Sequence, residues 1–127
     1  MKVFDSSAVL ALLFEESGAD IAAKWMDEGP ALISCVNQIE VITRLIDHGA
    51  TAAHAEATFA TLPLDVLAFT REYAQAAAAL RPATRALGLS LGDRCCLALA
   101  QLTPGAVVIT ADRPWAKLKG FKVSLIR

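Results

Sequence analysis

Short apolar segments alternate with longer segments of helical pattern along this chain. This alternation is the sequence feature that most restricts which folds the chain can adopt. The apolar segments, each of strand length, are residues 2–4, 31–34, 64–66, 106–110 and 122–125. Helical patterns occupy residues 6–14, 19–28, 36–49, 51–60, 70–87 and 90–102, and Pro82 should kink or restart the fifth of them. Short apolar strands joined through helices are typical of a parallel sheet covered on both faces. We therefore expect an α/β fold with a central, mostly parallel sheet of four to five strands flanked by helices.

Length and composition favour one domain that does not enter a membrane. The chain has 127 residues, near the common size of a domain, and its 55% hydrophobic content allows a sizeable core. No apolar run approaches the roughly 18 residues of a transmembrane helix. The three cysteines lack the spacing of zinc ligands or redox motifs, so we expect reduced thiols. These features predict a single cytoplasmic domain over residues 1–127.

Four acidic residues stand in apolar surroundings that are unusual for carboxylates. They are Asp5 in VFDSSAVLALL, Glu40 in NQIEVITRL, Asp93 in SLGDRCCLALA and Asp112 in VVITADRPW. A buried carboxylate is costly unless it is hydrogen-bonded, paired or bound to a cation. Asp5 ends the first expected strand and Asp112 follows the fourth, and the carboxyl ends of parallel strands share one edge of a sheet. Glu40 on an inward helical stripe and Asp93 in the first turn of a helix can point to the same edge.

Such a cluster has the chemistry of a divalent cation site. Mg²⁺ and Mn²⁺ prefer oxygen ligands and often use only one or two direct carboxylates. Water bound to the metal loses a proton more readily and can attack phosphorus. Without a cation the four acids would repel one another and would repel a nucleic acid. The pattern therefore predicts a metal-dependent nuclease.

Each acid also has a local explanation that the sequence leaves open. Asp5 can cap the helix that follows it. Asp93 stands three residues after Ser90, which is the spacing of a capping box. Asp112 can be an ordinary turn residue, and Glu40 can pair with Arg44 one helical turn later. The functional interpretation therefore depends on the four occurring together.

Charge is divided unevenly between the two halves of the chain. Residues 1–65 have a net charge of −7, and residues 66–127 have a net charge of +6. The segment after Asp112 contains no acid and has five basic residues, Arg113, Lys117, Lys119, Lys122 and Arg127. A polyanion can lie against such a surface. The alternative is ordinary charge scatter on a solvated surface.

The segments V-F-D-S-S-A-V-L-A-L-L, N-Q-I-E-V, L-S-L-G-D-R-C-C-L-A-L-A and V-I-T-A-D-R-P-W resemble the PIN-domain family. More narrowly, they resemble the VapC-type toxins of bacterial type II toxin–antitoxin pairs, over essentially the whole chain. The resemblance implies a Mg²⁺- or Mn²⁺-dependent endoribonuclease that hydrolyses RNA and so inhibits translation and growth. It implies that Asp5 and Asp93 bind the metal directly, and that Glu40 and Asp112 bind it directly or through water. Supporting polar positions of the family match Ser6, Asn37 and Thr110.

The resemblance also implies partners for the chain. They are an RNA substrate, a second copy in a homodimer, and a cognate VapB-type antitoxin in a heterotetramer or larger assembly. Many relatives carry a further acid where this chain has Pro114, which puts a second metal site in doubt. Two other interpretations stay open. One is a PIN-type nuclease that acts in RNA processing or on DNA, and the other is a catalytically silent binding module with this fold.

Overall fold

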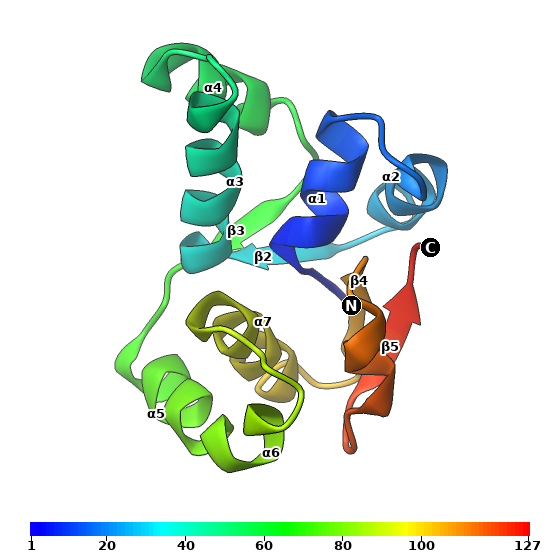
Figure 1. The fold of residues 1–127 in the computed structure, drawn as a ribbon, viewed down its shortest axis with the longest axis vertical. Helices are drawn as coiled ribbons and strands as arrows, with labels where there is room; N and C mark the ends of the chain where they lie inside the picture. Colours follow the sequence, from blue (N-terminus) through cyan, green and yellow to red (C-terminus); the bar gives the residue numbers. More distant parts are fainter.

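A five-stranded parallel sheet forms the centre of the computed structural model, which describes residues 1–127 (Figure 1). The strand order is β3-β2-β1-β4-β5, and every neighbouring pair is parallel. The strands are β1 (Lys2–Phe4), β2 (Ala31–Ser34), β3 (Asp65–Leu67), β4 (Val107–Thr110) and β5 (Lys122–Leu125). Each strand lies within one residue of its predicted position, and the expected α/β fold with a parallel sheet is confirmed.

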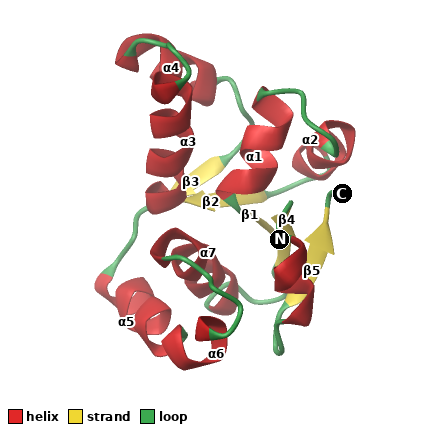
Figure 2. Ribbon diagram, in the orientation of Figure 1, coloured by secondary structure: helices red, strands yellow, loops and turns green.

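Helices connect the strands and lie on both sides of the sheet (Figure 2). They are α1 (Ser6–Leu13), α2 (Ala19–Asp27), α3 (Cys35–Asp47), α4 (Ala52–Ala60), α5 (Arg71–Ala79), α6 (Arg81–Arg85), α7 (Leu91–Gln101) and the 3₁₀ helix η1 (Arg113–Lys117). The helix predicted over residues 70–87 is divided at Leu80, and Pro82 lies in the first turn of α6, where a missing N–H is tolerated. None of these helices combines the length and the apolar character needed to span a bilayer.

Side chains alternate between the two faces of the sheet and divide the core into two layers. Phe4, Ile33 and Ile109 point to the face that α1–α4 cover, where they pack with apolar residues of those helices. Val3 and its neighbours on β2 and β4 point to the opposite face, against α7 and Trp115 of η1. This period of two follows from strand geometry, and it explains why each short strand is apolar throughout.

The strand order reverses between β1 and β4, which makes the carboxyl edge of the sheet between them a topological switch point. The chain leaves β1 into α1 on one face and leaves β4 into η1 on the other face. The amide N–H of Asp5 donates to the carbonyl of Ile109 over 2.9 Å, so the ends of the two strands remain joined. Ligands of open parallel sheets usually bind at such a point.

Candidate metal centre

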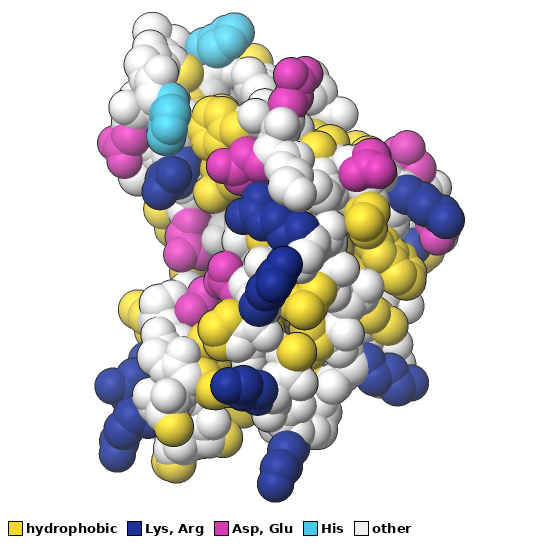
Figure 3. Space-filling model, turned by 45° about the vertical axis from the view of Figure 1, so that its right-hand side comes forward, with side chains coloured by type: hydrophobic (Ala, Val, Ile, Leu, Met, Phe, Trp, Pro, Cys, Tyr) yellow, Lys and Arg dark blue, Asp and Glu magenta, His cyan; other side chains and the backbone are white.

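Three carboxylates meet at this edge, from three different elements. Asp5 follows β1, Asp112 follows β4, and Asp93 lies in the first turn of α7. Each of the three offers one oxygen, and these oxygens all lie within 4.8 Å of one another. Acidic side chains also border the hollow at the left edge of the surface in Figure 3, between the two helical layers. The fold therefore concentrates negative charge in one place.

Asp5 is the most deeply buried of the three, with 1% of its surface exposed. Its Oδ2 accepts hydrogen bonds from the hydroxyl of Ser7 at 2.5 Å and of Thr110 at 3.0 Å, while its Oδ1 is buried without any partner. Burial raises the pKa of Asp5 to about 7, Ser7 opposes the rise, and the charges of Asp93 and Asp112 add to it. Asp5 occupies the N-cap position of α1, but its side chain makes no capping bond. The helix cap proposed as its local explanation is therefore absent.

Asp93 is both a capping residue and a member of the cluster. Its Oδ2 accepts a hydrogen bond from the backbone N–H of Ser90 at 2.8 Å, and the Ser90 hydroxyl accepts one from the N–H of Asp93 at 3.2 Å. This is the capping box that the sequence spacing indicated. Because a carboxylate has two oxygens, the cap fixes the side chain and leaves the second oxygen for another ligand. The two explanations of Asp93 are therefore compatible.

Asp112 lies half-buried at the start of η1. Its backbone N–H donates to the Thr110 hydroxyl at 3.1 Å, and its side chain makes no cap bond to η1. Burial raises the pKa of Asp112, the Asp93 charge raises it further, and Arg127 lowers it. Asp112 is thus more than a turn residue, because its carboxylate stands in the field of the other acids.

Glu40 lies beside the three-carboxylate cluster rather than within it. Its Oε1 accepts hydrogen bonds from the hydroxyl of Ser6 at 3.0 Å and from Nδ2 of Asn37 at 2.7 Å. Its negative charge contributes to the raised pKa of Asp112, which places it in the same electrostatic neighbourhood. The pairing with Arg44 considered from the sequence does not form, since the chain's two side-chain ion pairs are elsewhere.

The three predicted supporting residues each contact an acid of the site. Ser6 and Asn37 donate to Glu40, and Thr110 donates to Asp5. Three further residues of the site were not predicted. Ser34 and Gly92 hold Asn37, since the Ser34 hydroxyl donates to Asn37 Oδ1 at 2.6 Å and the Gly92 carbonyl accepts from Asn37 Nδ2 at 3.0 Å. Ser7 donates directly to Asp5. Ser7 is not among the residues predicted to contact an acid. Its position two residues after Asp5 was the available signal.

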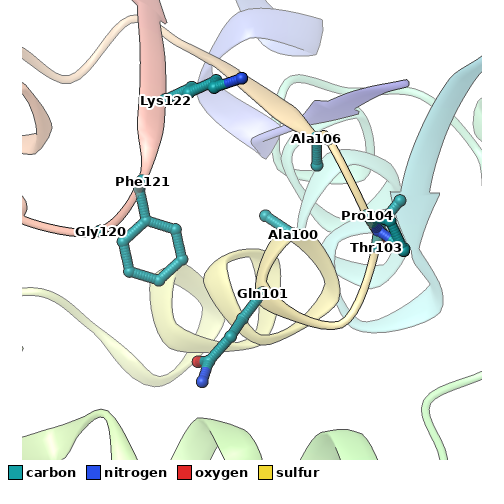
Figure 4. Close-up of a pocket in the computed structure, with 9 residues that line it drawn as sticks. Ala100, Gln101, Thr103, Pro104, Ala106, Gly120, Phe121 and Lys122 are labelled. Carbon is teal, nitrogen blue, oxygen red and sulfur yellow. The ribbon is translucent and has the colours of Figure 1, made fainter.

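Two hollows of the molecule lie away from these acids. One has a volume of about 300 Å³ and opens beside Gln101, Phe121 and Lys122, near the amino ends of β4 and β5 (Figure 4). The other, of about 410 Å³, lies between α6 and the segment that joins η1 to β5. Neither has an acidic residue in its lining, so the carboxylate cluster is separate from both cavities.

Comparison with known proteins identifies the family. The toxin–antitoxin complex from Klebsiella pneumoniae contains a chain with 22% identity and a TM-score of 0.76, and the match covers 100% of this chain and 98% of that one. The DNA-bound VapBC of Salmonella typhimurium matches with 15% identity over 99% and 98% of the two chains, at a TM-score of 0.72. VapBC2 of Rickettsia felis, bound to a promoter DNA fragment, matches with 12% identity over 97% and 96%, also at 0.72. No curated protein matches the chain. Residues 2–120 match the family model of the PIN domain, and the chain belongs to the PIN-domain family.

Proposed function

We propose that this protein is a metal-dependent endoribonuclease, the VapC-type toxin of a toxin–antitoxin pair, which cleaves RNA and so stops translation and growth. The observation that carries the proposal is the unpartnered, buried Oδ1 of Asp5 beside the carboxylates of Asp93 and Asp112. Three acids this close destabilise one another, and a buried carboxylate oxygen without a partner costs free energy. A divalent cation at this position would offset both costs.

The donor set fits Mg²⁺ or Mn²⁺. The groups that converge are all carboxylates, which suit hard cations, whereas zinc sites are usually built from cysteine and histidine. Asp5 and Asp93 would hold the ion directly, with Asp112 and Glu40 binding directly or through water. Once bound, the ion would lower the pKa of a coordinated water and neutralise phosphate charge. Pro114, two residues after Asp112, offers no metal ligand at that position, so the proposal is limited to one ion.

The surrounding residues would keep the acids in reactive geometry. Ser7 and Thr110 hold Oδ2 of Asp5, which fixes the direction of its free Oδ1. Ser6 and Asn37 both donate to Oε1 of Glu40, which leaves Oε2 to accept a hydrogen bond or a proton from water. Attack of water on phosphorus would then break the bond to the 3′-oxygen, which would take up a proton from solvent. The products would be a 3′-hydroxyl and a 5′-phosphate.

Charge and fold support RNA and an antitoxin as partners. Arg113, Lys117 and Lys119 are exposed on the segment that begins at Asp112, and basic side chains are spread over the lower part of the surface in Figure 3. RNA can follow such residues to the acidic site. The likeness to chains of toxin–antitoxin complexes supports a VapB-type antitoxin as partner. We further propose a homodimer that joins the antitoxin in a heterotetramer or larger assembly, and a cytoplasmic location.

The test combines purified protein with growth measurements. RNA cleavage by the purified protein should stop in EDTA and return with Mg²⁺ or Mn²⁺, and mass spectrometry of the products should find 5′-phosphates. Induction of the chain alone should arrest growth, and co-expression of the small protein encoded beside it should relieve the arrest. Cleavage that persists in chelator would contradict the metal mechanism. Metal-dependent cleavage without growth arrest would favour a processing nuclease, and no cleavage of RNA or DNA would favour a silent binding module.

A further inference from the structure

Gly92 is the one glycine of this chain without a positive φ angle, so its backbone conformation does not require glycine. The other six have positive φ angles, from 66° to 115°. Gly92 lies inside α7, near its start, with no such angle. Because alanine has a higher helix propensity than glycine, backbone conformation alone would favour alanine at residue 92. The reason for glycine must therefore be the space around it.

That space is filled by the carboxylate of Glu40. A Cβ atom added to Gly92 would lie 2.6 Å from Cδ of Glu40 and 2.7 Å from its Oε1, closer than real side chains approach. The two residues come from α7 and α3, which are in contact near the site. A methyl group at residue 92 and the present position of the Glu40 carboxylate are mutually exclusive.

Glu40 is held in this place by groups that are themselves fixed. Nδ2 of Asn37 donates both to Glu40 Oε1 at 2.7 Å and to the carbonyl of Gly92 at 3.0 Å, and so joins the two residues. Asn37 is fully buried, and the Ser34 hydroxyl donates to its Oδ1. A displaced carboxylate would therefore lose the Asn37 bond, because Asn37 has no room to follow it.

The first turn of α7 is also a favourable place for negative charge. The first amide groups of a helix lack intrahelical acceptors, and the helix dipole is positive at this end. A glycine at residue 92 lets the Glu40 carboxylate approach this backbone closely, directly beside Asp93. We propose that Gly92 is a positioning residue, whose missing side chain sets where the Glu40 carboxylate stands relative to Asp93. The effect on RNA cleavage rests on the proposed function, whereas the contact between Gly92 and Glu40 does not.

The test uses Gly92→Ala in two backgrounds, with Glu40 present and with Glu40→Ala. With Glu40 present, the side-chain amide signals of Asn37 in a ¹⁵N NMR spectrum should shift, and kcat for RNA should fall at least about tenfold. With Glu40→Ala, the added methyl has room, so Gly92→Ala should raise the unfolding temperature more than it does when Glu40 is present. Leu91→Ala, at an exposed position of the same helical turn, is the control and should leave the Asn37 signals and kcat unchanged.

The outcomes separate the two proposals. Equal changes in unfolding temperature in both backgrounds, together with unmoved Asn37 signals, would overturn the role of Gly92. Normal kcat in Gly92→Ala would overturn it as well. A third outcome is that the wild-type protein cleaves no RNA, while Gly92→Ala moves the Asn37 signals and changes the unfolding temperature differently in the two backgrounds. In that case the proposed function fails and the positioning contact between Gly92 and Glu40 stands.

Discussion

The hydroxyl of Thr110 donates a 3.0 Å hydrogen bond to Oδ2 of Asp5, and so links the last residue of β4 to the carboxylate that follows β1. The same hydroxyl accepts the backbone N–H of Asp112 at 3.1 Å. One buried side chain therefore orients two of the three clustered acids. Its position depends on the parallel register, in which Phe4 pairs with Ile109.

Replacing Thr110 by valine should weaken metal binding without unfolding the protein. Valine keeps the shape and removes the hydroxyl, so Asp5 loses one of its two donors and the N–H of Asp112 loses its acceptor. We expect metal affinity or activity to fall about 10- to 100-fold, with a stability loss of about 1–3 kcal/mol. Isothermal titration with Mn²⁺ and thermal unfolding measure the two effects.

Thr103→Val is the matched control for this substitution. The Thr103 hydroxyl donates to the carbonyl of Leu99 at 2.7 Å, after the carboxyl end of α7 and away from the acids. Its loss should lower stability by a comparable amount and leave Mn²⁺ affinity unchanged. If both variants bind Mn²⁺ as the wild type does, Thr110 has no role in orienting the acids.

Asp93→Asn should separate the capping role of Asp93 from its proposed metal role. The amide oxygen of asparagine can still accept the Ser90 N–H, so α7 should keep its cap and the unfolding temperature should change little. The lost negative charge should reduce RNA cleavage at least about 100-fold. Asp65→Asn, on exposed β3, makes the same chemical change outside the site and should retain wild-type activity. Full cleavage by purified Asp93→Asn would contradict the metal assignment.

The sheet could be predicted from the sequence because the strand and helix patterns in this chain are strong and local. The strand ending at Thr110 is β-branched throughout, and prolines and glycines separate the elements. The edge on which Asp5 and Asp112 meet also follows from the parallel order of the strands. These parts of the prediction depend on local patterns of a few residues each, and such patterns can be identified in a single sequence.

The details of the site depend on distances that no local pattern contains. Ser7 and Thr110 are 103 residues apart, yet their hydroxyls lie 3.2 Å from each other beside Asp5. The close approach of Glu40 to Gly92 depends on how α3 packs against α7, and a single sequence does not specify that packing. The capping box of Asp93, by contrast, was visible in the spacing of Ser90 and Asp93 because it is local.

The metal-free protein should lose stability as the pH rises from about 4 to 7. The pKa of Asp5 is raised from 3.8 to about 7 in the folded protein, so the folded state binds more protons than the unfolded state over this range. Ionising the buried carboxylate then costs on the order of a few kcal/mol, and the cost persists above pH 7. The raised pKa of Asp112 acts in the same direction.

Urea unfolding in EDTA at pH 5 and pH 8 measures this effect. Addition of Mg²⁺ at pH 8 should restore much of the lost stability, since a cation stabilises the ionised acids. Asp5→Asn cannot ionise, so it should reduce the pH dependence and the gain from Mg²⁺. A metal-free protein that is more stable at pH 8 than at pH 5 would contradict the burial of an unpaired Asp5 carboxylate.

Lys117 and Lys119 should contribute to RNA affinity rather than to the chemical step. Both are exposed on the segment that follows Asp112, and neither forms an ion pair. The logarithm of the RNA binding constant falls linearly with the logarithm of the salt concentration, and each lysine that neutralises a phosphate contributes about 0.7 to this slope for single strands. The double variant Lys117→Gln, Lys119→Gln should therefore reduce the slope by about 1.4. KM for RNA should rise and kcat should stay near its wild-type value, because the acids are unchanged. Lys24→Gln, whose side chain is 76% exposed on α2, should leave both the slope and KM unchanged. A double lysine variant with the wild-type salt slope would place the RNA on another surface.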